Sequence, residues 1–331
     1  MNRKIFACLS LAIAGTLALA PPLRAQPLEE ITYLLPAPPT TTGFIPFMIA
    51  QQRGYYTAEG LKVNFISAKG GLDVTKQVGA GNAPIGGAIG DTAVIARAQG
   101  IPVKLVALLG GKPYHHVQIL TDSGITDIKG LKGKTLNVMS YQDTSYMTLL
   151  GVIAGEGLAK SDVTVEAAGP TGVWQTAVAG RAVGFVGPMA WAVDAQGAGK
   201  KVTTIESDRF LPSMAQAIIA SDDMIAKRPE LIAKLVRATL RGLQDIIDDP
   251  KGVVPDFIAA SPSYKGREER ISTQLLLDIK YTYSGAPRLG WIDADRLKVL
   301  QDFYLKQRLI PQASAVDALY TNKFVPETKA K

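Results

Sequence analysis

The chain has 331 residues, a formal net charge of +7, two histidines and a single cysteine. One cysteine excludes a disulfide framework and any zinc or iron–sulfur site built from several cysteines. With 47% hydrophobic and 20% charged residues, the composition is that of a globular protein long enough for about two domains.

Residues 1–25 are predicted to be a cleavable secretory signal peptide. Arg3 and Lys4 precede an apolar run over residues 5–20, and Leu23 and Ala25 occupy the positions that a signal peptidase reads. An apolar run of about 16 residues is short of the roughly 20 that span a bilayer, so cleavage is favoured over an uncleaved anchor. The mature chain is therefore expected to be exported.

Removal of this segment changes the charge and the cysteine content. The net charge falls from +7 to +4, because Arg3, Lys4 and Arg24 are lost together with no acidic residue. No cluster of five or more Lys and Arg residues stands out, so nucleic acid is not expected as a partner. Cys8 is also lost, which leaves no cysteine nucleophile, and its place near the start of the apolar run argues against a lipoprotein.

The first half of the mature chain alternates short β-rich runs with helical patterns. Strands are predicted over residues 31–35, 62–66, 84–88 and 103–109, and helices over residues 45–52, 72–79 and 92–99. Gly54 and Gly100 follow two of these helices, as C-terminal glycines do.

A second alternating series begins near Val117. It contains predicted strands over residues 134–139, 163–167, 183–186, 202–205 and 217–220, and predicted helices over residues 146–154, 173–179 and through Trp191. Two successive β–α–β series predict two mostly parallel sheets with helices on both faces.

The last third of the chain is predicted to be helical, over residues 229–248, 270–283 and 294–307. Pro229 suits the first turn of the long helix, and Asp293 is a plausible N-cap of the last one. Their apolar stripes are interpreted as core-facing and are assigned no chemistry.

Six polar turns follow predicted strands and open predicted helices, at residues 39–44, 67–71, 90–92, 140–145, 169–172 and 187–189. In open α/β sheets, ligands bind beyond the carboxyl ends of the strands. Helix starts also offer free N–H groups that suit an anion. Capping explains any single turn equally well, so the repetition of the pattern is the stronger indication.

Aromatic residues and histidines near these turns leave two interpretations open. Trp174 and Trp191 are either core residues or a flat wall for a ligand. His115 and His116 would point to opposite faces of a strand, so one of them could face a cleft. No zinc-ligand spacing exists, and no metal site is expected.

Enzyme templates mostly fail on this sequence. There is no Gly-x-Ser-x-Gly elbow, no P-loop and no dinucleotide fingerprint after the first strand, so no cofactor is expected. Serine and aspartate are plentiful, but no spacing indicates a catalytic triad.

Several stretches together resemble a known family, at residues 46–56 (PFMIAQQRGYY), 59–63 (EGLKV), 79–83 (GAGNA), 96–104 (ARAQGIPVK) and 131–134 (LKGK). They resemble the periplasmic solute-binding proteins of ABC importers, in the nitrate/sulfonate/taurine and thiamine-pyrimidine-precursor branch. The resemblance covers most of residues 31–245.

The resemblance implies an α/β, two-lobed type II periplasmic-binding-protein fold, in which each lobe is a mostly parallel sheet flanked by helices. Lobe one would comprise residues 26–116 and 208–331, and lobe two residues 117–207. The cleft residues expected to bind ligand are Thr42, Gly43, Phe44, Gly70, Gly71, Asp91, Thr92, His115, Thr144, Ser145, Thr171, Trp174, Pro188 and Met189.

The implied function is a receptor rather than an enzyme. It would capture a small anionic ligand of sulfonate or carboxylate type between the lobes, and deliver it as a monomer to the transmembrane subunits of an ABC permease. Two alternatives remain, a secreted enzyme of the same fold and a sensor that presents its ligand to a membrane receptor. A eukaryotic relative that makes the thiamine pyrimidine is cysteine-rich near its site, and the absence of cysteine after residue 25 argues against the enzyme.

Overall fold

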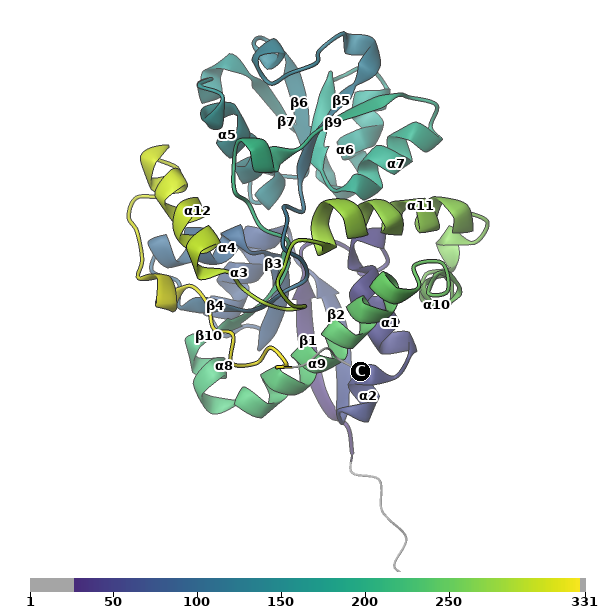
Figure 1. The fold of residues 1–331 in the computed structure, drawn as a ribbon, viewed down its shortest axis with the longest axis vertical. Helices are drawn as coiled ribbons and strands as arrows, with labels where there is room; N and C mark the ends of the chain where they lie inside the picture. Colours follow the sequence, from purple (N-terminus) through teal and green to yellow (C-terminus); the bar gives the residue numbers. More distant parts are fainter. Residues whose placement is uncertain (1–26, 328–331) are drawn as a thin grey trace, which may run out of the picture.

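Two five-stranded sheets form the framework of the chain (Figure 1). The computed structural model describes residues 27–327, so the predicted signal peptide lies outside the described residues. The first sheet has the order β2-β1-β3-β10-β4. Its strands are β1 (Glu29–Leu35), β2 (Leu61–Ser67), β3 (Ile85–Ile89), β4 (Val103–Leu108) and β10 (Gln216–Ser221).

The second sheet has the order β7-β6-β8-β5-β9. Its strands are β5 (His116–Leu120), β6 (Thr135–Val138), β7 (Thr164–Ala167), β8 (Gly184–Gly187) and β9 (Val202–Ile205). The chain therefore crosses from the first sheet to the second after β4 and returns after β9. We call the first sheet with its helices lobe one, and the second sheet with its helices lobe two.

Each sheet is mixed and contains one antiparallel strand. In lobe one, β1 runs parallel to β2 and β3, with Ile31 opposite Val63, whereas β10 is antiparallel to both β3 and β4. In lobe two, β6 runs parallel to β7 and β8, and β5 is antiparallel to β8 and β9. The predicted two-lobed α/β architecture is confirmed, and the antiparallel strand in each sheet is the one that enters it directly from the other lobe.

The helices of lobe one and of the C-terminal region are α1 (Ile45–Gln52), α2 (Tyr55–Ala58), α3 (Gly71–Gly79), α4 (Asp91–Ala98), α8 (Asp222–Lys227), α9 (Pro229–Asp248), α10 (Val254–Ala260), α11 (Glu268–Asp278) and α12 (Ala294–Lys306). Lobe two carries α5 (Thr144–Gly155), α6 (Gly169–Val178) and α7 (Met189–Gly197). Asp293 caps α12 as predicted, because its Oδ1 accepts the N–H groups of Asp295 and Arg296.

The short helices α2, α8 and α10 were not predicted, because four to seven residues are too few to show a helical period. The predicted helix over residues 270–283 is also divided. It is α-helical to Asp278 and continues as a π-helical turn over Ile279–Tyr283.

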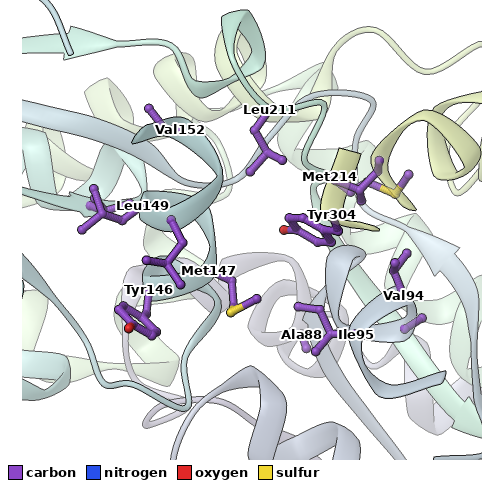
Figure 2. Packing of buried hydrophobic residues seen from close by; sticks show 14 of the residues in the cluster. Ala88, Val94, Ile95, Tyr146, Met147, Leu149, Val152, Leu211, Met214 and Tyr304 are labelled. Carbon is purple, nitrogen blue, oxygen red and sulfur yellow. The ribbon is translucent and has the colours of Figure 1, made fainter. Parts of the chain in front are cut away.

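One cluster of buried apolar side chains runs through both lobes. Figure 2 shows Met147 of α5 in lobe two pointing toward Ala88 and Ile95 of lobe one. On another side, α11 lies against lobe two and packs on α7 (Figure 1). The lobes therefore touch on two sides and enclose the space between them. Within residues 27–327, no helix combines the length and apolar character that crossing a bilayer requires.

Candidate ligand-binding site

A cavity of about 390 Å³ lies between the two lobes. Lobe one lines it with residues of the β1–α1 loop, β3 and β10, and lobe two with the starts of α5, α6 and α7. Residues of the α10–α11 region complete the wall. This volume lies within the range of sites that hold small organic molecules.

Eight of the fourteen predicted ligand residues line this cavity, namely Thr42, Gly43, Phe44, His115, Thr144, Thr171, Trp174 and Pro188. They come from both lobes, so the structure brings together residues that are up to 146 positions apart in the chain. Three of them, Thr144, Thr171 and Pro188, come from the helix-opening turns of lobe two.

Gly70 and Gly71 lie at a contact between the lobes and do not line the cavity. A Cβ on Gly70, whose φ is +120°, would lie 3.1 Å from the Gln142 carbonyl oxygen. Beside it, the Leu72 N–H donates to the same oxygen at 3.2 Å. A side chain at Gly70 would therefore strain the backbone and hold the lobes apart.

Asp91 is absent from the lining and is fully buried. Its carboxylate accepts hydrogen bonds from Ser213 Oγ at 2.9 Å, from the Met214 N–H at 2.8 Å and from the Tyr304 hydroxyl at 2.6 Å. Burial raises the pKa of Asp91, and these donors oppose that rise. Asp91 thus joins α4 to the returning chain and to α12.

Three other predicted residues also lie outside the lining and make contacts within their own lobe. The Thr92 hydroxyl donates to the Ile89 carbonyl at 2.8 Å, and the Ser145 hydroxyl accepts the Met139 N–H at 3.1 Å. The Met189 sulfur accepts from Gln118 Nε2 at 3.7 Å. These contacts are the capping and packing roles that a turn residue can have instead of binding ligand.

The lining also contains residues outside the fourteen predicted ligand residues, namely Tyr114, Asp143, Trp191, Asp194, Gln216, Tyr264, Arg267 and Arg270. For Trp191, the sequence left open a place in the core or in the wall of the site. Asp143 lies in a predicted turn and Trp191 lies beside one, so the turn pattern in the sequence could have indicated both as cavity residues. Tyr264, Arg267 and Arg270 belong to the C-terminal helical region, which lies in the cavity wall only because the chain returns to lobe one.

The buried end of the cavity is formed by His115, Asp143 and Gln216, each no more than 6% exposed. Asp143 caps α5, because its Oδ1 accepts the Ser145 N–H at 2.8 Å. Burial lowers the pKa of His115 although the Asp143 carboxylate opposes that shift, so the imidazole is neutral near pH 7. Its Nδ1 has no hydrogen-bond partner among the described residues.

Gln216 fixes the loop that carries Gly43. Its Nε2 donates to the Gly43 carbonyl at 2.9 Å, whereas its Oε1 is buried without a partner among residues 27–327. A Cβ on Gly43 would lie 2.5 Å from the Tyr114 hydroxyl. Glycine at this position therefore leaves room for the Tyr114 hydroxyl.

Aromatic side chains form much of the remaining wall, namely Phe44, Phe47, Tyr114, Trp174, Trp191 and Tyr264. The Trp191 ring packs directly against Gly187, where any side chain would displace it. Flat apolar rings of this kind suit the body of an aromatic or aliphatic ligand.

The exposed end of the cavity carries the charged residues Asp194, Arg267 and Arg270. Arg270 of α11 forms an ion pair with Asp194 of α7, and the two side chains are 29% and 27% exposed. This pair joins the C-terminal region to lobe two. Arg267 lies one turn earlier in the chain and is exposed at the same end.

The described residues offer no group of three or more His, Cys, Asp and Glu side chains that could hold a metal ion. Their chemistry at the cavity consists of hydroxyl, amide, imidazole, carboxylate and guanidinium groups around aromatic rings. Such a set can bind an organic molecule through hydrogen bonds and stacking.

Comparisons with known proteins agree with this architecture. A family described as NMT1/THI5-like matches residues 41–253. The riboflavin-binding protein RibY of Chloroflexus aurantiacus is 28% identical, over 95% of this chain and 91% of that protein. A 4-amino-5-hydroxymethyl-2-methylpyrimidine phosphate synthase of Aspergillus parasiticus is 25% identical, over 85% of this chain and 89% of that one. The alkanesulfonate-binding protein SsuA of Xanthomonas axonopodis shares the fold, with a TM-score of 0.71 and 16% identity over 90% of this chain and 100% of that one.

Proposed function

Because this chain belongs to the NMT1/THI5-like family, we propose that it is a periplasmic solute-binding receptor. It captures a small organic acid, of sulfonate or carboxylate type, between its two lobes. It then delivers this ligand, as a monomer, to the transmembrane subunits of an ABC permease. The observation that carries the proposal is the cavity lined by both lobes, because a ligand held there bridges them and favours the closed form.

The starts of two helices support an acidic ligand. Thr171 lies in the first turn of α6 and Pro188 precedes α7, and both line the cavity. Helix N-termini carry a partial positive charge that attracts anions. Arg267 at the exposed end adds a full positive charge beside α7.

The alternative of a secreted enzyme draws on the relatives that are named as pyrimidine phosphate synthases. It would need a nucleophile or a base poised at the cavity. The chain has no cysteine after Cys8, so it lacks a thiol nucleophile, and this favours binding over catalysis.

Isothermal titration of the mature chain tests the proposal directly. The series contains sulfonates, aromatic carboxylates, nitrate and pyrimidine precursors, and one compound class is expected to bind with one molecule per chain. Trp174→Ala is expected to weaken binding about tenfold through the loss of a buried ring contact. Trp291→Ala serves as the control, because Trp291 lies outside the lining. Turnover of a compound would favour the enzyme instead.

A further inference from the structure

The sequence predicts Gly70 and Gly71 as ligand residues, but they lie outside the cavity lining and are buried where the two lobes meet. A Cβ on Gly70 would lie 3.2 Å from the Asp143 Cα and 3.3 Å from the Asp143 Cβ, both in lobe two. A Cβ on Gly71 would lie 3.3 Å from the Thr144 Cγ2. Glycine thus lets the backbone of lobe one approach residues 142–144 of lobe two closely. We call the two glycines and these three residues the closure contact.

Two hydrogen bonds between the lobes flank the pair of glycines. The Ser140 hydroxyl donates to the Lys69 carbonyl at 3.4 Å, and the Leu72 N–H donates to the Gln142 carbonyl at 3.2 Å. Leu72 lies in the first turn of α3, where an N–H group has no partner within the helix. Lobe two therefore supplies the acceptor that this helix start lacks.

The closure contact can exist only while the lobes are together. The chain joins the lobes by two crossovers, after β4 and after β9, and the closure contact belongs to neither of them. Asp143 and Thr144 also line the cavity. Moving lobe two away from lobe one to admit a ligand therefore separates these two residues from Gly70 and Gly71.

We propose that Gly70 and Gly71 are positioning residues, which set how readily the receptor closes without touching the ligand. Their backbone docks on lobe two and brings Asp143 and Thr144 into the cavity wall. A side chain at either glycine acts as a wedge that favours the open form, and lowers the affinity for every ligand by the same factor. This inference rests on the proposed receptor function and deepens it, because it assigns part of the affinity to a contact between the lobes.

A disulfide across the closure contact tests the inference without any ligand. The chain has no cysteine after Cys8, so Gly71→Cys combined with Thr144→Cys introduces the only two thiols beyond that residue. The Thr144 Cγ2, whose place a cysteine sulfur can take, lies 3.3 Å from a Cβ at position 71. We expect mild oxidation to join the two sulfurs. The oxidised protein should then have a radius of gyration about 0.5–1 Å smaller than its reduced form, measured by small-angle scattering.

Gly79→Cys combined with Ile101→Cys is the matched control. A Cβ on Gly79, at the other end of α3, would lie 3.8 Å from the Ile101 Cβ, and both residues belong to lobe one. This disulfide should form without a change in the radius of gyration. Failure of the interlobe pair to oxidise, or a radius that its disulfide leaves unchanged, would overturn the inference.

Gly71→Ala measures the effect on affinity, by isothermal titration with sulfonates, aromatic carboxylates, nitrate and pyrimidine precursors. Every compound that binds the wild type is expected to bind about threefold to tenfold more weakly, with the order of affinities unchanged. Gly79→Ala crowds Ile101 within lobe one instead, so it should lower stability and leave affinities as they are.

Unchanged affinities in Gly71→Ala, a changed order of affinities, or an equal loss in Gly79→Ala would contradict the role of the closure contact. If no compound in the series binds the wild type, the receptor proposal fails. The disulfide experiment uses no ligand, so it still decides whether the two lobes close on this contact.

Discussion

Asp278 is a buried carboxyl group behind the cavity wall. It is 3% exposed, and Gln274 Nε2 donates to its Oδ2 at 3.1 Å and to the Thr42 carbonyl at 3.2 Å. Burial raises the pKa of Asp278 to about 7, and the hydrogen bond from Gln274 opposes the shift. The neighbouring hydroxyls of Tyr114 and Tyr283 also have raised pKa values, chiefly because they are buried.

The raised pKa predicts a stability that falls as the pH rises. Between about pH 4 and pH 7 the folded chain holds the Asp278 proton more tightly than the unfolded chain does. Raising the pH through this window therefore favours unfolding, by up to about 4 kcal/mol from this group. Asp278→Asn removes the titration and can keep the bond from Gln274.

Thermal unfolding of Asp278→Asn measures this effect. Relative to the wild type, we expect a melting temperature at least about 3 °C higher at pH 8, and a smaller difference at pH 5. A difference that is the same at both pH values would show that Asp278 does not titrate in this window.

At the residue scale, local sequence patterns located some of the residues that line the cavity, but they could not reveal contacts with residues distant in the chain. Thr144 and Thr171 were chosen because they open helices after strands, and both line the cavity. Asp91 was chosen for the same reason, but its carboxylate is occupied by Tyr304 and Ser213. Those partners lie more than 120 positions away in the chain, so no local pattern could reveal them.

At the element scale, the packing of α9 on α1 supports the loop that lines the cavity. Residues 42–44 directly precede α1, and Gly242 of α9 faces the backbone of α1. A Cβ on Gly242 would lie 2.6 Å from the Pro46 carbonyl oxygen and 2.8 Å from the Ala50 nitrogen. The glycine allows this close approach of two helices.

Gly242→Ala is therefore expected to destabilise the fold. Overpacking against backbone atoms lowers the free energy of unfolding by about 1–3 kcal/mol. This loss outweighs the stabilisation that alanine gives a helix through its higher helix propensity than glycine. Urea unfolding measures the loss. Gly172→Ala in α6 is the matched control, because its Cβ would find its nearest neighbour at 3.7 Å, and it should be neutral or slightly stabilising. Equal stabilities of the two variants would contradict the proposed close contact.

The contact between α11 and α7 holds the exposed end of the cavity together. The Arg270–Asp194 ion pair crosses from the C-terminal region to lobe two, and both side chains are partly buried. Burial raises the pKa of Asp194, and the Arg270 charge opposes that rise. The pair is therefore placed to favour the closed arrangement of the lobes.

Arg270→Gln is expected to weaken ligand binding about threefold to tenfold, because the closed form loses a contact that the open form does not make. The radius of gyration of the ligand-free variant, measured by small-angle scattering, should increase. Arg237→Gln is the control, since Arg237 pairs with Glu59 within lobe one at 2.7 Å. If both variants bind and scatter as the wild type does, the ion pair has no part in closure.

The role of α11 was missed because its sequence pattern is ambiguous. Its buried residues include Ile271 and Leu275, which give an amphipathic stripe typical of a core helix. The same helix also carries Arg270 into the cavity wall. Periodicity shows which face is buried but not which lobe or cavity the flanking residues meet.

At the scale of the whole molecule, the alternation of strands and helices predicted two sheets flanked by helices, and the family resemblance implied that they form two lobes. Period-two runs such as residues 62–66 became strands, and the 20-residue stripe of α9 became a helix with the predicted bounds. The order of the strands did not follow from periodicity. The return of the chain as β10 between β3 and β4 is a long-range pairing that no local pattern contains.

The mature protein is predicted to begin at Gln26, after export through the inner membrane. N-terminal sequencing of the protein from a periplasmic extract measures this directly. Recovery of a chain that still carries residues 1–25 would contradict the prediction and favour an uncleaved anchor.

The central claim is that the chain holds an organic acid between its lobes and releases it unchanged. Mass spectrometry of the intact complex, and of the compound released from it, tests this claim most directly. The account predicts one compound per chain and a released compound of the same mass as the one supplied. A released compound of altered mass, or no complex with any member of the titration series, would contradict it.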